Sequence, residues 1–181
     1  MKAIVKVPNL VLTTPAQPVK SFDKHLAGII ADMKQTLTST VNPKGVGLAA
    51  PQIGIPYRIF LTRPSDSSEI RVFINPEIIK FSKRLTDGVP ERENKLEGCL
   101  SIPGIWGKVK RSQSLTLRYQ DEKGRQHTES YGGFLATIIQ HETDHVNGIL
   151  YTRRAVEQKG NLYQAIKDKE GKEALEEIEL Q

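Results

Sequence analysis

The chain has 181 residues, of which 38% are hydrophobic and 26% are charged. These fractions are ordinary for a globular protein and exclude disorder along the whole length. We expect a single domain over 1–181, because two domains of ordinary size need a longer chain. No apolar run approaches the roughly 20 residues that span a bilayer, and no export signal is evident, so the sequence predicts a cytoplasmic protein without membrane contact.

The formal net charge is +5, and a basic surface favours anionic partners such as nucleic acid. Lys and Arg are nevertheless scattered, with no basic stripe interleaved with aromatic residues, which argues against sequence-specific nucleic-acid binding. The one cysteine, Cys99, excludes an internal disulfide framework. Its thiol is therefore a core group, a nucleophile or a metal ligand.

The N-terminal third of the chain divides into an arm, a helix and a loop. Residues 1–20 contain three prolines and no carboxylate, which predicts an extended arm. Apolar residues at helical spacing predict an amphipathic helix over 22–38, with Ser21 as its N-cap. Glycines and prolines between 42 and 56 predict a loop in which no regular helix persists.

The middle of the chain is predicted to be largely β, because short segments rich in branched and aromatic residues alternate with turns. The expected strands cover 57–62, 72–75, 78–81, 115–119 and 126–131. The last two are expected to pair as an antiparallel hairpin, and the polar segment 81–95 is expected to be a loop.

The last third of the sequence predicts two helices. An apolar stripe indicates a buried helix over 134–147, for which Gly148 is a natural stop. Apolar residues among alternating charges over 161–181 indicate a more exposed C-terminal helix, interrupted near Gly171.

The buried helix carries His141-Glu142-Thr143-Asp144-His145, an HExxH motif. At 3.6 residues per turn the two histidines project within about 40° of each other, while Glu142 stands about 60° from His145. Two imidazoles can therefore bind one metal ion, and the carboxylate can accept a proton from metal-bound water. The alternative, core histidines beside solvated charges, would place ionisable groups in an apolar helix without partners, which is costly.

A catalytic metal site normally takes three protein ligands, so a third donor is needed. The metzincin position holds Tyr151, which excludes that class, and His25 and His127 are isolated. Glu170 or Glu173 would give a zinc endopeptidase, the first alternative function. A catalytically silent protein with a structural metal is the second, although such sites are usually closed by four ligands.

Cys99 is the preferred third donor. It lies between Gly98 and Pro103, which indicate a tight turn that can present a thiolate. A lone cysteine is more often a small buried apolar residue. The HExxH motif in the same chain favours a role as metal ligand instead.

The segment 45–52, GVGLAAPQ, has the spacing of a dinucleotide-binding loop. Pro51 follows at once and no strand precedes the segment, which excludes that interpretation. Small residues instead let the backbone approach a ligand closely, and Gln52 offers a neutral amide donor. A tight packing element is the alternative.

Three blocks, GVGLAAPQ at 45–52, EGCLS at 97–101 and QHETDH at 140–145, together resemble the peptide deformylase family. The resemblance extends from the N-terminal arm to Gly148. It implies an α+β fold in which antiparallel β-sheets surround the HExxH helix. It also implies hydrolysis of the formyl group from the N-terminal methionine of nascent polypeptides, so that N-formylmethionyl peptides are the substrates.

The resemblance also implies roles for individual residues. The metal ligands, the general acid/base and the oxyanion site are matched by Cys99, His141 and His145, by Glu142, and by Gln52 with the backbone N–H of Leu100. The peptide strand and the methionine pocket are matched by Val46, Gly47, Phe134, Thr137 and Ile138. Thr137 is more polar than the aliphatic residue expected there, which is unfavourable for a strict methionine preference.

The implied cofactor is one divalent metal ion. A thiolate donates more electron density than imidazole and favours an ion softer than zinc. The resemblance implies Fe(II) in the cell, with zinc, nickel or cobalt able to occupy purified protein.

The resemblance further implies transient contact with the ribosome through the C-terminal helix. Residues 161–181 are acidic overall, which is unfavourable for a helix that binds phosphate. Arg153, Arg154 and Lys159 are the preferred contacts.

Overall fold

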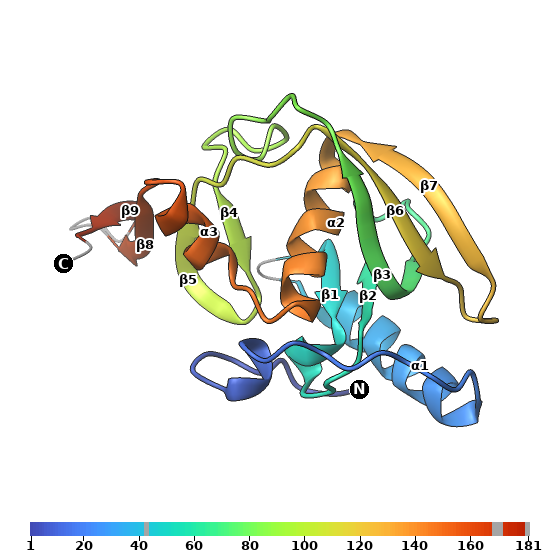
Figure 1. The fold of residues 1–181 in the computed structure, drawn as a ribbon. Coiled ribbons are helices and arrows are strands. Elements are labelled where there is room, and N and C mark those ends of the chain that lie inside the picture. Colours follow the sequence, from blue (N-terminus) through green and yellow to red (C-terminus); the bar gives the residue numbers. More distant parts are fainter. Residues whose placement is uncertain (42–43, 168–171, 180–181) are drawn as a thin grey trace.

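The computed structural model describes residues 1–41, 44–167 and 172–179 (Figure 1). The elements in chain order are η1 (Leu10–Leu12), α1 (Lys24–Ser39), β1 (Gly47–Ala49), η2 (Ala50–Ile53), β2 (Ile59–Thr62), β3 (Arg71–Phe81), β4 (Glu97–Cys99), β5 (Ile102–Gly107), β6 (Ser114–Gln120), β7 (Gln126–Gly132), α2 (Gly133–Val146), α3 (Tyr151–Glu157), β8 (Leu162–Lys167) and β9 (Glu173–Ile178). None of the described helices has the length and apolar character needed to cross a membrane.

Two antiparallel sheets lie on either side of α2 (Figure 1). The larger has the strand order β1-β2-β3-β6-β7, and the smaller has the order β4-β5-β8-β9. The expected α+β fold, with antiparallel sheets around the HExxH helix, is therefore confirmed. So is the hairpin, since β6 and β7 pair from Ser114 with Gly132 to Gln120 with Gln126.

The larger sheet is covered by a helix on each face. Leu26, Ile30 and Met33 of α1 pack on one side with apolar residues of β1 and β2. Ile139 and Val146 of α2 pack on the other side with aromatic residues of β2 and β3. The HExxH helix is thus fixed by its apolar face, and its polar face is left for the site.

The ends of α1 and α2 are set by capping residues, and the predicted N-cap of α1 needs correction. Asp23, and not Ser21, is the N-cap of α1, and its Oδ1 accepts a hydrogen bond from the Leu26 N–H at 3.0 Å. Asp23 occupies this role because it is one residue before the first helical turn, where a side-chain oxygen reaches the free N–H groups. The stop after α2 is confirmed: Gly148 has φ of +71°, and a Cβ there would lie 2.8 Å from the Thr14 carbonyl carbon.

The N-terminal arm is confirmed as an extended segment that binds other loops through its backbone. The Val5 N–H donates to the Gln52 carbonyl, the Val7 N–H donates to the Ser101 carbonyl, and the Ala16 N–H donates to the Val146 carbonyl. The arm therefore contacts the segment that contains Gln52, the turn after Cys99 and the end of α2. The short helix η1 is an addition to the prediction.

Some strand predictions need correction. The strands expected at 72–75 and 78–81 are one strand, β3, which continues through Pro76 because pairing with β6 is irregular between Ile74 and Glu77. The loop predicted over 42–56 contains β1 and the 3-10 helix η2. The loop predicted over 81–95 is confirmed beyond the end of β3.

The predicted C-terminal helix is wrong. Residues 162–167 and 173–178 form the hairpin β8–β9, whose first strand pairs with β5 from Ile105 with Gln164 to Gly107 with Leu162. Without β8, backbone groups along the edge of β5 would be unpaired. Leu162 is also buried against Tyr151 and Ala155 of α3. These tertiary contacts outweigh the helical propensity of the charged residues. The interruption expected near Gly171 lies outside the described residues.

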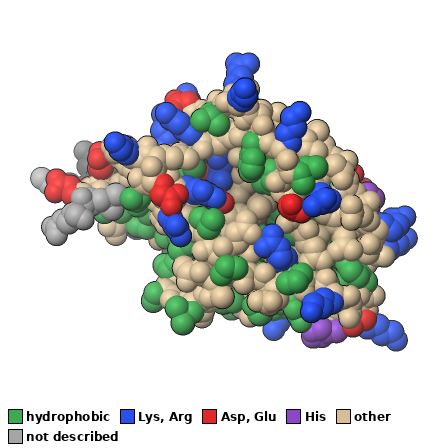
Figure 2. Space-filling view, in the orientation of Figure 1, with side chains coloured by type: hydrophobic (Ala, Val, Ile, Leu, Met, Phe, Trp, Pro, Cys, Tyr) green, Lys and Arg blue, Asp and Glu red, His purple; other side chains and the backbone are tan. Residues whose placement is uncertain are grey.

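Figure 2 shows Lys and Arg side chains spread over one face of the molecule, without a single basic patch. This distribution agrees with the scattered positions of these residues in the sequence.

Candidate metal centre and substrate cleft

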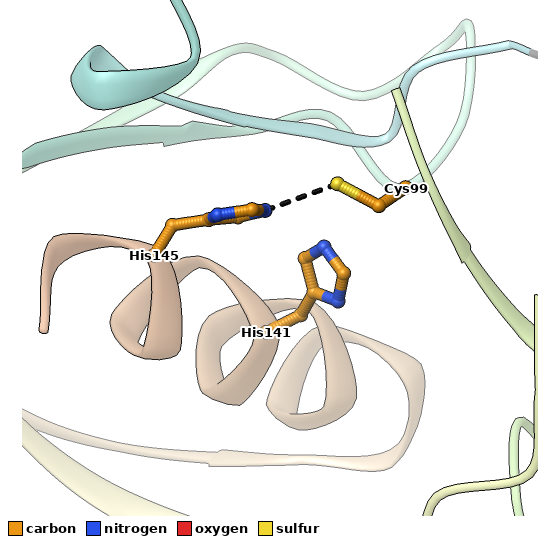
Figure 3. A group of neighbouring side chains, drawn as sticks. All are labelled: Cys99, His141 and His145. Carbon is orange, nitrogen blue, oxygen red and sulfur yellow. Dashed lines mark hydrogen bonds between the residues drawn. The ribbon is translucent and has the colours of Figure 1, made fainter. Parts of the chain in front are cut away.

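Side chains from α2 and the end of β4 converge on one point (Figure 3). Ligand atoms of Cys99, His141 and His145 all lie within 4.8 Å of one another, and the Cys99 sulfur is 3.2 Å from Nε2 of His145. Zinc and similar divalent ions bind sulfur and nitrogen at about 2.0–2.3 Å, so one cation can reach all three atoms after small adjustments. Three protein donors leave a fourth position open, as catalytic sites do.

The cysteine is held by the turn between β4 and β5. Cys99 pairs with Ile102 where the register of the two strands shifts, which points the sulfur at the helix. Gln52 Nε2 donates to this sulfur at 3.4 Å, while Gln52 Oε1 accepts from the Ala49 N–H at 2.8 Å. The Gln52 amide is thereby fixed beside the metal position.

A buried ion network holds the first histidine. Nδ1–H of His141 donates to Oε1 of Glu97 at 2.5 Å, which leaves Nε2 for a metal. Glu97 also accepts two hydrogen bonds from Arg111, at 2.7 and 2.8 Å. Arg111 in turn pairs with Asp144 at 3.0 Å, and Arg154 binds the same carboxylate from the surface. Burial opposes ionisation of Glu97, but Arg111 and His141 outweigh it and hold its pKa below the usual range.

The two histidines have different electrostatic environments. Burial lowers the pKa of His145 well below its ordinary value, and the nearby His141 adds to this effect. His145 is therefore neutral, which is the form that binds metals. Burial also disfavours the charged form of His141, but the Glu97 carboxylate outweighs burial and raises the pKa of that residue.

Glu142 lies beside the convergent donors and is 3% exposed. Its Oε2 atom is buried without a hydrogen-bond partner among the described residues. Burial raises the pKa of Glu142 to about 7, so that the carboxyl group can hold or release a proton near neutrality. The carboxylate packs on Gly47, where a Cβ would lie 2.3 Å from Oε1. A side chain at this position of β1 would displace the Glu142 carboxyl group.

A cleft opens in front of these groups, and all residues expected at the site except His145 line it. They are Cys99, His141 and Glu142, Gln52 and Leu100, and Val46, Gly47, Phe134, Thr137 and Ile138. His145 lies deeper, at 1% exposure. The Thr137 hydroxyl is buried in this wall and has no hydrogen-bond partner within the described ranges.

Comparison with known proteins agrees with this geometry. The family model described as "Polypeptide deformylase" matches residues 1–161. The chain belongs to the peptide deformylase family. Deformylases hydrolyse the formyl group from formylated peptides and release formate, and this chain is such a hydrolase.

Similar deformylases come from several bacteria. Peptide deformylase 1 of Bacillus cereus is 39% identical over 151 residues, covering 83% of this chain and 90% of the relative. The crystal structure of peptide deformylase from Thermotoga maritima has a TM-score of 0.74 at 33% identity, covering 85% of this chain and 97% of the other. A Met-Ala-Ser-bound deformylase from Acinetobacter baumannii has a TM-score of 0.74 at 32% identity, covering 84% and 97%.

The other ligand candidates do not join the cluster in the described part of the chain. His127 stacks on Tyr119 and binds Asp121 at the β6–β7 turn. Glu173 is an exposed residue that begins β9, and Glu170 lies outside the described residues. The deformylase family assignment replaces the endopeptidase and silent-protein alternatives.

Sequence reasoning missed Glu97 and Arg111 as supports of the metal site. Glu97 stands two residues before Cys99 in the EGCLS block, so its position was a usable signal. The sequence around Arg111 does not indicate this role, because the residue contacts Glu97 and Asp144 only in the folded chain.

Replacing Glu97 with Gln is expected to weaken metal affinity about 10-fold to 100-fold, because the partner that orients His141 loses its charge. Titration of metal-free protein with Zn²⁺ in competition with a chelator measures this affinity. Glu129→Gln is the control, because Glu129 pairs with Arg71 on the larger sheet, away from the ligand cluster. Equal affinities of wild type and Glu97→Gln would contradict the support role.

Proposed function

We propose that residues 1–181 form one cytoplasmic catalytic domain that deformylates the N-terminal methionine of nascent polypeptides. The convergence of one cysteine and two histidines beside Glu142, whose Oε2 has no hydrogen-bond partner among the described residues, supports this proposal. One divalent ion, held by Cys99, His141 and His145, fits this donor set. When bound, such an ion supplies Lewis-acid polarisation of the formyl oxygen and lowers the pKa of a water molecule.

Glu142 is the general acid/base in this proposal. Its buried Oε2 atom has no hydrogen-bond partner in the part of the chain that the structure describes, so it is available to accept a proton from the attacking water. The same carboxyl group then donates that proton to the nitrogen of the leaving amine. Its elevated pKa suits both transfers, because the group changes protonation state near neutral pH.

Gln52 and Leu100 are the oxyanion donors. Negative charge develops on the former formyl oxygen as the tetrahedral intermediate forms, and one well-placed donor contributes about 3 kcal/mol to its stabilisation. The Gln52 amide is orientated by its bond to Ala49, and the Leu100 backbone N–H follows the cysteine directly in the same turn.

The peptide binds as an added strand beside Val46 and Gly47, a mode that reads main chain rather than sequence. The methionine side chain enters the pocket formed by Val46, Phe134, Thr137 and Ile138, which line the cleft together. Thr137 makes this pocket more polar than an aliphatic residue would.

Fe(II) is the proposed metal in the cell, with zinc, nickel or cobalt possible in purified protein. Because oxidation of iron or of the ligating thiolate destroys the site, we expect the ferrous enzyme to lose activity in air. Formate release is measured before and after exposure to air, with anaerobic ferrous enzyme and the zinc form as controls. No loss in air, together with equal activity of the zinc form, would contradict the iron assignment.

Transient contact with the ribosome is proposed through basic residues near α3. Arg153, Arg154 and Lys159 are candidates, although Arg153 pairs with Glu157 and Arg154 pairs with Asp144. The β8–β9 hairpin takes the place of the helix on which this expectation first rested.

The decisive experiment for the proposed function is release of formate from formyl-Met-Ala by protein prepared without oxygen. We expect turnover that depends on bound divalent metal and stops when a chelator removes it. Absence of formate from metal-loaded protein would overturn the proposed function.

A further inference from the structure

Arg92 lines the substrate cleft without a carboxylate partner. Its guanidinium lies over the Trp106 ring, 5.0 Å from the ring centroid, and its Nη1 donates to the Leu96 carbonyl at 3.2 Å. No Asp or Glu oxygen lies within 4 Å of it in the described residues. Both Arg92 and Trp106 face the same cleft as Glu142 and Gln52.

The charged groups near Arg92 already form ion pairs with other residues. Glu97, whose charge acts on Arg92, is bound by Arg111 and His141. Lys44, the other cation that lines the cleft, pairs with Asp66. Arg92 is thus a partly buried cation with a carbonyl and a ring as its neighbours, and burial lowers its pKa. A carboxylate supplied by a ligand would compensate this loss of hydration.

Arg92 and Trp106 come from other segments of the chain than the proposed methionine pocket. The proposed methionine pocket consists of α2 and the segment around Val46. Trp106 lies on another wall, where it pairs with Gly98 across β4 and β5. A Cβ at Gly98 would lie 2.6 Å from the Trp106 ring, so the glycine lets the ring pack closely against β4, beside the residue that precedes Cys99. A peptide leaving the metal position along this wall presents its later side chains to Arg92.

We propose that Arg92, stacked on Trp106, is a specificity-determining residue that binds an acidic side chain in the residues after the formylated methionine. This inference rests on the deformylase function and adds a substrate class to it: formylated peptides with Asp or Glu at the second or third position.

The test compares isosteric peptides that differ only in charge. Formyl-Met-Ala-Glu is compared with formyl-Met-Ala-Gln, and formyl-Met-Glu-Ala with formyl-Met-Gln-Ala, all as C-terminal amides. At one of these positions we expect kcat/KM to be about fivefold higher for Glu, as for a favourable, partly exposed ion pair. The preference is expected in KM rather than kcat, and to shrink at about 0.5 M salt.

Arg92→Gln should abolish this preference, so that the ratio of kcat/KM for the Glu peptide to kcat/KM for the Gln peptide falls to about one. Arg84→Gln is the matched control, because Arg84 is an exposed arginine of the same loop that does not line the cleft. Arg92→Glu should reverse the preference towards formyl-Met-Ala-Lys. Direct binding of the products Met-Ala-Glu and Met-Ala-Gln, as amides, gives a readout independent of turnover, with the Glu peptide binding several-fold more tightly to wild type.

Equal kcat/KM for the Glu and Gln peptides at both positions in wild type would overturn the inference, whether or not the variants fold. Persistence of the preference in Arg92→Gln, or its equal loss in Arg84→Gln, would also overturn it. A chain that releases formate from no peptide fails the proposed function, whereas one that releases formate equally from both peptides fails only this inference.

Discussion

Glu142→Ala is expected to lower kcat for formyl-Met-Ala by about 10³-fold, within the range for loss of a general acid/base. The variant should still bind one metal ion per chain, because the cysteine and histidine donors are separate from this carboxylate. Its thermal stability should not fall, since a buried carboxyl group with a raised pKa is disfavoured in its charged form. Formate release, metal analysis and thermal unfolding measure the three quantities.

Glu142→Gln is the matched variant, because it keeps the shape that packs on Gly47 and removes only the ability to transfer a proton. It should lose turnover to a similar extent. Wild-type turnover in either variant would show that Glu142 is not the acid/base. Loss of metal together with turnover would instead assign a ligand role to the carboxylate.

The HExxH helix could be predicted because its signals are local. Apolar residues at helical spacing bury one face of α2, and Gly148 supplies the backbone conformation that ends it. The spacing of His141 and His145 then places both imidazoles on one side. These relations depend on helix geometry alone and need no knowledge of distant residues.

Non-local contacts explain what the sequence could not provide. The β8–β9 hairpin forms because β5 offers an edge and Leu162 packs under α3, and neither fact is visible in the charged sequence of the tail. The pairing of Arg111 with Glu97 and Asp144 likewise joins residues from three separate segments. Such contacts decide the outcome wherever local propensity is weak.

The position of Cys99 shows how a motif and the fold combine. The residue resembles any small buried side chain, and the turn around it predicts exposure of the thiol but not its direction. The register shift between β4 and β5 and the hydrogen bond from Gln52 direct the sulfur to His145. The resemblance to the family predicts Cys99 as a ligand, and the fold supplies the direction of its sulfur.

Cys99→Ala is expected to abolish stable metal binding, because two imidazoles alone hold a divalent ion weakly. The metal content of dialysed protein should fall from one ion per chain to near zero, and formate release should fall with it. The fold should persist, since removal of one buried sulfur atom costs only about 1–2 kcal/mol of unfolding free energy. Elemental analysis and circular dichroism measure the two effects.

Ser101→Ala is the matched control for this variant. Ser101 lies in the same turn, is fully buried and has its hydroxyl 3.4 Å from Gln52 Nε2, but it is not among the convergent donors. We expect it to retain its metal. Full metal occupancy in Cys99→Ala would show that another residue is the third ligand, and the proposed centre would then be wrong. Equal metal loss in both variants would attribute the effect to disruption of the turn rather than to the sulfur.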